Sequence, residues 1–144
     1  MLTHKLDPVD LNHKNMRKFD GTMVYAQNKR QQVVMTEHLA KKFPKVYFAS
    51  MHPGWSDTPA VQTSMPSFRE KMINKLRTPE QGGDTLVWSC CYSDLENNEA
   101  YPSGCFLQDR VSVSKHLPLA WTKNSEDEEN VLMTKLDELY KRFE

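Results

Sequence analysis

Tyr25 and Lys29 are the residues of this chain whose types and spacing best fit a chemical role, and they lie in the segment GTMVYAQNKRQQVVMTEHLAKKFP. Positions i and i+4 of a helix share one face, so the lysine ammonium can lie beside the tyrosine phenol. A phenol has a reference pKa of about 10, and a neighbouring cation favours its ionised form. Such a tyrosine can exchange a proton with a substrate oxygen near neutral pH. A packed ring beside a solvated lysine would show the same spacing, so the pair alone leaves both interpretations open.

A second candidate site lies in the segment HPGWSDTPAV, where Pro53 and Gly54 end a short apolar run and Thr58 completes a Pro-Gly-x-x-x-Thr pattern. Ligands of open α/β sheets bind beyond the carboxyl ends of the strands, where this turn is expected. Glycine allows a close approach of the backbone to a flat ring, and a threonine hydroxyl can bond an amide or phosphate oxygen. An ordinary turn after a strand, with Thr58 as a helix cap, would give the same pattern.

The elements that position these residues are predicted to alternate between helix and strand. The helix that carries Tyr25 and Lys29 is expected to begin at Thr22, as its cap, and to end before Pro44. Its apolar stripe is expected to include Tyr25, Val33, Met35, Leu39 and Phe43. The predicted boundaries are 1–21 for a loop, 22–43 for this helix, 45–52 for a strand, 53–76 for a loop with room for a short helix over 65–76, 78–92 for a helix, 103–110 for a strand and 125–143 for the C-terminal helix.

Two strands separated by helices predict an α/β fold with a parallel sheet that helices cover on both faces. Two strands are too few to form such a sheet, which suggests that the chain is a portion of a larger fold. Capping boxes at Thr78 and Ser125 support the last two helices. The Gly82-Gly83 pair suggests close packing of helix 78–92, and Cys90-Cys91 is expected to lie in the core.

Composition argues against several classes of protein. Lys plus Arg and Asp plus Glu both number 19, so no global field favours nucleic acid or an anionic membrane. The longest apolar run, around 86–92, is too short to span a bilayer. Three cysteines, two of them adjacent, do not form a disulfide framework, and a reducing, cytoplasmic location is expected. The five histidines lack the spacing of metal ligands, so no metal site is expected.

The strings MVYAQNK and SMHPGWSDTPAV resemble the C-terminal half of the short-chain dehydrogenase/reductase family, and FDGTMVYAQNKRQQVV, EQGGDT and FLQDR extend this resemblance over essentially the whole chain. The resemblance implies that residues 1–144 are the C-terminal part of a single Rossmann-like domain with a doubly wound parallel sheet. It also implies NAD(P)-dependent interconversion of a small-molecule carbonyl and alcohol. Tyr25 would relay the proton, Lys29 would bind the nicotinamide ribose, and the cofactor side of the site would be lined by Pro53, Gly54, Trp55 and Thr58.

Two parts of the family's site are not found in this sequence. The five glycines form no glycine-rich turn of the kind that binds a pyrophosphate at a helix N-terminus, so the dinucleotide-binding half is expected to be absent. The family's serine, which holds the substrate oxygen, is also not found, because Asn12 and His13 stand at the usual spacing. Thr3 is the only hydroxyl residue of 1–20 and is not assigned that role.

The expectation is therefore a truncated form of an oxidoreductase that is inactive alone and binds neither NAD nor NADP by itself. The alternative is a non-catalytic fragment that acts at most as an association module. In the family that the chain resembles, the Tyr-Lys helix commonly takes part in dimer helix bundles, so a homo-oligomer is compatible with both interpretations.

Overall fold

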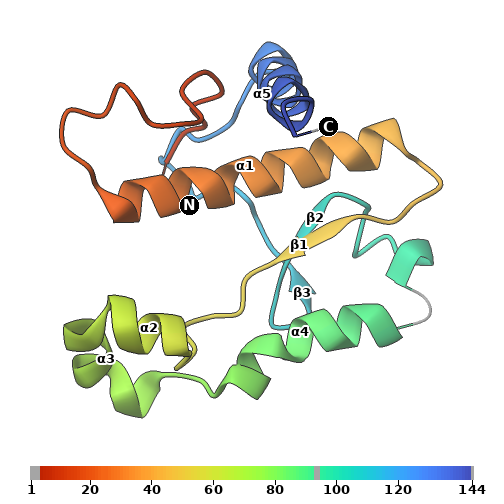
Figure 1. Ribbon diagram of the computed structural model, residues 1–144. Coiled ribbons are helices and arrows are strands. Elements are labelled where there is room, and N and C mark those ends of the chain that lie inside the picture. Colours follow the sequence, from red (N-terminus) through yellow and green to blue (C-terminus); the bar gives the residue numbers. More distant parts are fainter. Residues whose placement is uncertain (1–3, 93–94, 144) are drawn as a thin grey trace. The chain divides into compact units, whose positions relative to one another are not determined.

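The computed structural model describes residues 4–92 and 95–143 of the chain (Figure 1). Within these residues the elements are the α-helices α1 (Gly21–Lys42), α2 (Pro59–Ser64), α3 (Pro66–Met72), α4 (Pro79–Cys91) and α5 (Glu126–Tyr140), the 3-10 helices η1 (Ile73–Lys75) and η2 (Leu95–Asn97), and the strands β1 (Ala49–Met51), β2 (Cys105–Gln108) and β3 (Val111–Ser112).

The chain forms two compact units. The helical unit consists of Met1–Phe48 and Ser114–Glu144 and contains α1 and α5, whereas the sheet unit consists of Ala49–Val113 and contains the strands and the other helices. The predicted site residues are divided accordingly. Tyr25 and Lys29 belong to the helical unit, and the sheet unit holds Pro53, Gly54, Trp55 and Thr58.

The helix α1 begins because the Asp20 side chain accepts hydrogen bonds from the backbone N–H groups of Thr22 (2.9 Å) and Met23 (3.1 Å). The cap is therefore Asp20 and not Thr22 as predicted, and the helix starts one residue earlier than expected. The core of the helical unit joins α1 to α5 and to the N-terminal loop, and its buried members are Leu6, Val34 and Leu132. A capping box between Ser125 and Glu128 starts α5, as the sequence predicts.

The apolar stripe predicted for α1 is wrong at its two ends, and two of its other members, Met35 and Leu39, are only half-buried. Tyr25 is 63% exposed and Phe43 is 45% exposed, and of the predicted stripe only Val33 is fully buried. The reason is that α1 buries two long polar side chains, Gln27 and Arg30, which bond backbone groups of other segments and so turn a different face inward. The residues that α1 buries are Ala26, Gln27, Arg30, Val33 and Val34.

The sheet has the strand order β1-β2-β3. β1 pairs with β2 in parallel, from Ala49 opposite Cys105 to Met51 opposite Leu107. The parallel pairing expected for the two predicted strands is present, but the strands are shorter than 45–52 and 103–110. β3 pairs with β2 in antiparallel orientation and was not predicted, so the sheet is mixed. The prediction fails because residues 109 and 110, assigned to a strand, both adopt positive φ and fold the chain back.

The segment 53–76, predicted as a loop with room for a short helix over 65–76, contains α3 within that range and also α2, which was not predicted. Thr58 caps α2 by accepting a hydrogen bond from the N–H of Val61 (3.3 Å), and α3 and η1 follow before residue 76. The capping box predicted at Thr78 is present and starts α4. Gly82 packs closely, since a Cβ there would collide with the Ser56 hydroxyl, whereas Gly83 faces open space.

The prediction that Cys90 and Cys91 lie in the core is wrong, because both are exposed. α4 turns Gly82 and Thr85 inward, and the exposed side of the helix carries Leu86, Val87 and the two cysteines. A run of apolar residues along one helix does not reveal which side is covered, since that depends on the neighbouring elements.

Among the residues described here, no helix combines the length and the apolar character needed to cross a membrane.

Candidate functional site

Tyr25 and Lys29 form a close pair on α1. The Lys29 ammonium lies 5.6 Å from the centroid of the Tyr25 ring, which is within the range of a cation–π contact. The ammonium also donates a hydrogen bond to the Gln32 side-chain oxygen (3.1 Å). Tyr25 is 63% exposed, so its hydroxyl lies on a face of the helix that a ligand can reach.

The buried face of α1 is anchored by two polar side chains. The Gln27 amide donates to the carbonyl of Lys5 (2.7 Å), and its oxygen accepts from the N–H of Asp7 (3.1 Å). Arg30 has no exposed surface and donates from Nη2 to the carbonyl of Lys115 (3.0 Å). Burial lowers the pKa of Arg30, an effect that the negative charge of Glu37 opposes. These contacts hold α1 to the N-terminal loop and to the segment before α5, and so fix which face of the helix carries Tyr25.

Neither Gln27 nor Arg30 was singled out from the sequence. A signal was present, because Arg30 stands four residues after Ala26 and four before Val34, both of which are buried. A lone arginine within an apolar row of a helix can indicate a buried guanidinium that bonds backbone carbonyls.

The Pro53-Gly54 turn follows β1 directly, at its carboxyl end, as the sequence predicts. Gly54 has φ of +74°, and its N–H donates to the His52 Nδ1 (3.0 Å). Burial lowers the pKa of His52, and the positive charge of Arg77 lowers it further. The histidine is therefore held in its neutral form, in which Nδ1 can accept this hydrogen bond.

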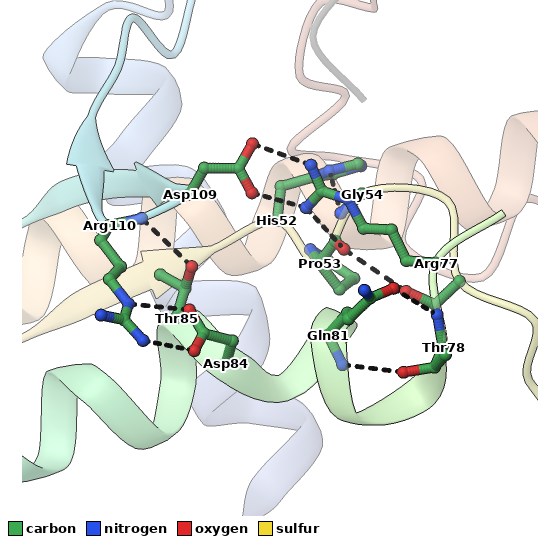
Figure 2. A network of polar contacts seen from close by, with 11 residues as sticks. His52, Pro53, Gly54, Arg77, Thr78, Gln81, Asp84, Thr85, Asp109 and Arg110 are labelled. Atoms are coloured by element: carbon green, nitrogen blue, oxygen red, sulfur yellow. Dashed lines mark hydrogen bonds and ion pairs between the residues drawn. The ribbon is translucent and has the colours of Figure 1, made fainter. Parts of the chain in front are cut away.

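Arg77 covers the Gly54 turn, as Figure 2 shows. A Cβ placed on Gly54 would lie 2.8 to 2.9 Å from the atoms of the Arg77 guanidinium and would force that group to move, and the positive φ also favours glycine here. The guanidinium forms a bidentate ion pair with Asp109 (2.5 and 2.9 Å) and lies 3.4 Å from the carbonyl oxygen of Pro53. The backbone of Arg77 also pairs with this segment, through hydrogen bonds with Trp55 and Asp57 (both 2.8 Å).

Trp55 and Thr58 have different environments within the sheet unit. Trp55 is 52% exposed, and its ring lies 4.6 Å from that of Phe68 on α3, measured between centroids. The Thr58 oxygen accepts the capping hydrogen bond of α2, so the cap interpretation of this residue holds. Its O–H remains a donor that a ligand oxygen could use.

The structure thus places Tyr25 beside Lys29. It places Pro53, Gly54 and Trp55 next to one another in one turn, and Thr58 follows Trp55 by three residues. Asn12 and His13 lie in the loop before α1, and Thr3 lies outside the described residues. Across 4–92 and 95–143, no group of three His, Cys, Asp or Glu side chains is arranged to hold a metal ion.

Arg77 and Asp109 are the residues of this site that sequence reasoning missed. They are 32 positions apart, and neither carries a motif that points to the other. The strings EQGGDT and FLQDR, which flank or contain them, were noted for their resemblance to a family but without a role.

The chain is similar to "Dehydrogenase/reductase SDR family member 12" of Homo sapiens and of Bos taurus, with 49% identity over 143 residues in each case. The match covers 99% of this chain and 44% of each relative, so the chain spans less than half the length of these curated relatives. A protein of Streptomyces sp. (strain C5), provisionally named as a daunorubicin C-13 ketoreductase, is 30% identical over 84 residues, which are 58% of this chain and 29% of that protein.

No family model matches the chain, and no solved structure matches it either. With 49% identity sustained over 99% of its length, the chain belongs to the short-chain dehydrogenase/reductase family, as a C-terminal portion of it.

Proposed function

We propose that this chain supplies the proton-relay helix and the nicotinamide-side turn of an NAD(P)-dependent oxidoreductase that interconverts a small-molecule carbonyl and an alcohol. The observation that carries the proposal is the pair on α1 formed by the exposed Tyr25 and the half-buried Lys29, in which the Lys29 ammonium lies 5.6 Å from the centroid of the Tyr25 ring. The names of the relatives, a dehydrogenase/reductase and a ketoreductase, describe this class of reaction.

Tyr25 is proposed to be the general acid and base. In reduction its hydroxyl donates a proton to the carbonyl oxygen of the substrate, and in oxidation the phenolate takes the proton back from the alcohol. The nicotinamide cofactor, when bound, supplies or accepts the hydride at the substrate carbon. Proton and hydride together convert C=O to CH–OH, so the step is balanced.

Lys29 is proposed to bind the nicotinamide ribose while it holds its place beside Tyr25. An ammonium has three N–H donors, and one of them is directed at Gln32. The others can donate to ribose hydroxyls from the same exposed face of the helix. In the sheet unit, the O–H of Thr58 and the half-exposed ring of Trp55 fit the amide and the flat face of a nicotinamide.

The residues present fit only the nicotinamide side of a dinucleotide. The five glycines of the chain form no glycine-rich turn for a pyrophosphate, so the chain by itself is proposed to bind NAD(P) weakly. Because the chain spans 44% of its curated relatives, activity is best measured in a chimaera in which it replaces the matching 143 residues of the human relative.

In this chimaera, Tyr25→Phe should lower kcat for carbonyl reduction by about 10²- to 10⁴-fold, because the proton path is lost while the ring is kept. Cofactor affinity should change little. Tyr140→Phe is the matched control, since Tyr140 on α5 is 64% exposed, almost the same as Tyr25, and has no proposed role. Near-normal turnover in a well-folded Tyr25→Phe protein would end the catalytic interpretation of α1.

A further inference from the structure

The turn between β2 and β3 holds two residues in an uncommon backbone conformation. Asp109 and Arg110 connect the strands directly and have φ of +52° and +61°. Two-residue hairpin loops favour positive φ at both positions, and the second position is usually glycine. Here it is an arginine, whose Cβ makes this conformation unfavourable. Such a conformation persists only where the surrounding contacts enforce it.

Each residue of this turn is held by a bidentate ion pair from a different segment (Figure 2). The Asp109 carboxylate binds Arg77, which precedes α4, at 2.5 and 2.9 Å. The Arg110 guanidinium binds Asp84 on α4 at 2.5 and 2.8 Å. The N–H of Arg110 also donates to the Thr85 hydroxyl (3.2 Å). Arg110 is thus fastened to α4 and Asp109 to the residue Arg77 before that helix, and only the pair made by Asp109 continues to another turn.

That second turn is Pro53-Gly54. The Arg77 guanidinium occupies the space next to Gly54, 2.8 to 2.9 Å from where a Cβ would stand, and lies 3.4 Å from the Pro53 carbonyl oxygen. Asp109, Arg77 and Gly54 therefore form one chain of contacts across positions that are far apart in the sequence. Ion pairs with this degree of exposure (35% for the Arg77 side chain and 52% for that of Asp109) contribute little to stability, so their effect is mainly on geometry.

We infer that Arg77 is a positioning residue for the Pro53-Gly54 turn and that the Asp109-Arg110 turn sets where Arg77 stands. The guanidinium limits the conformations of Gly54 and the direction of the Pro53 carbonyl, and so keeps in register the segment that leads into Trp55 and Thr58. This inference rests on the proposed function for its meaning in the reaction, although the contacts themselves do not depend on it.

The test is ¹H–¹⁵N NMR of the 144-residue chain, with hydrogen exchange of the Gly54 amide, which donates to His52, as the readout. Asp109→Asn weakens the hold on Arg77 and should shift the Gly54 resonance and speed its exchange by about tenfold or more. Asp84→Asn is the matched control. It neutralises the carboxylate on α4 that binds Arg110, the other residue of the turn, and it does not touch Arg77. Because Asp84 helps to hold the turn but does not contact Arg77, this variant should change the Gly54 exchange rate much less than Asp109→Asn does.

Arg77→Lys and Arg77→Met provide a second comparison should Asp109→Asn lose its fold. Both remove the bidentate fork, but lysine keeps a charge near Asp109, so it should restore part of the Gly54 protection that methionine loses. Resonances of α5 serve as the control for folding. Equal effects of Asp84→Asn and Asp109→Asn, or an unchanged Gly54 in Arg77→Met, would overturn the inference.

An activity measurement in the chimaera separates this inference from the proposed function. Asp109→Asn should raise the KM for NAD(P)H several-fold with a smaller change in kcat, because it displaces the cofactor-side turn and leaves Tyr25 in place. Asp84→Asn should raise the KM much less than Asp109→Asn does, because it leaves the ion pair of Arg77 in place. If Asp109→Asn perturbs Gly54 in the NMR experiment while KM stays constant in an active chimaera, the positioning contact stands and the proposed cofactor role of the turn is wrong.

Discussion

Gly54→Ala, made both in the original chain and in an Arg77→Ala background, measures the contact between Gly54 and the Arg77 guanidinium. The added Cβ meets two separate penalties. The first is its positive φ of +74°, which costs a residue with a Cβ about 1–2 kcal/mol. The second is overlap with the Arg77 guanidinium, from which it would lie 2.8 to 2.9 Å. Overpacking of this kind costs about 1–3 kcal/mol, and the low end applies here because the guanidinium is the end of a flexible side chain.

The expected cost of Gly54→Ala is therefore about 2–3 kcal/mol in the original chain, the sum of strain and overlap. In an Arg77→Ala background only the strain remains, and the cost should fall to about 1–2 kcal/mol. The double-mutant cycle should thus show a coupling of about 1 kcal/mol between the two positions. Urea unfolding of the four proteins, followed by circular dichroism, measures each term.

Gly83→Ala is the control for this cycle. Gly83 lies inside α4 with no atom within 4 Å of its would-be Cβ, so alanine there should stabilise the protein by about 0.5–1 kcal/mol. That change should be the same with and without Arg77. If Gly54→Ala costs the same in both backgrounds, the guanidinium does not lie over Gly54 and the reasoning about this turn fails.

Two further outcomes follow from other parts of the chain. Burial alone would raise the pKa of Glu129, but hydrogen bonds from Lys41 and His38 outweigh it and hold that pKa below its usual value of 4.5. A lowered pKa means that this carboxylate stabilises the fold above about pH 4.5 and loses that effect as pH falls. Between about pH 6 and about pH 3, the Tm should therefore fall more steeply in the original chain than in Glu129→Gln. Parallel curves of Tm against pH would contradict this. In the folded chain a thiol reagent should modify Cys90 and Cys91 rapidly, because both are exposed, and the buried Cys105 only after denaturation. A mass-spectrometric time course that shows one or three rapidly modified cysteines would contradict this assignment of exposed and buried thiols.

Local signals in the sequence were enough to determine several features of this protein. The capping boxes of α4 and α5 and the Pro-Gly turn after β1 all depend on residues within a few positions of each other. A side chain that bonds a backbone N–H three residues away acts before any tertiary contact forms, so its pattern can be read directly. The family, too, was evident from such strings, as the 49% identity to the relatives bears out.

Only the tertiary structure decided which faces of the helices are buried. The sequence places Tyr25 in an apolar stripe, but α1 instead buries Gln27 and Arg30, whose partners are carbonyls of Lys5 and Lys115. Those partners lie 22 and 85 residues away, and backbone carbonyls carry no sequence signature. A polar side chain becomes a core residue only when such acceptors are brought to it, which no pattern within one helix can show.

The same reason applies to the sheet unit. The strand β3 exists because Asp109 and Arg110 take positive φ, and they do so because Arg77 and Asp84 hold them from outside the hairpin. Gly54 was predicted to allow the backbone to approach a flat ligand ring, and that stays a prediction; the group that the structure places beside Gly54 is the Arg77 guanidinium, from 23 residues further along the chain. Local residue types thus determined where the turns and helix ends lie, whereas contacts between distant segments decided what those turns hold in place.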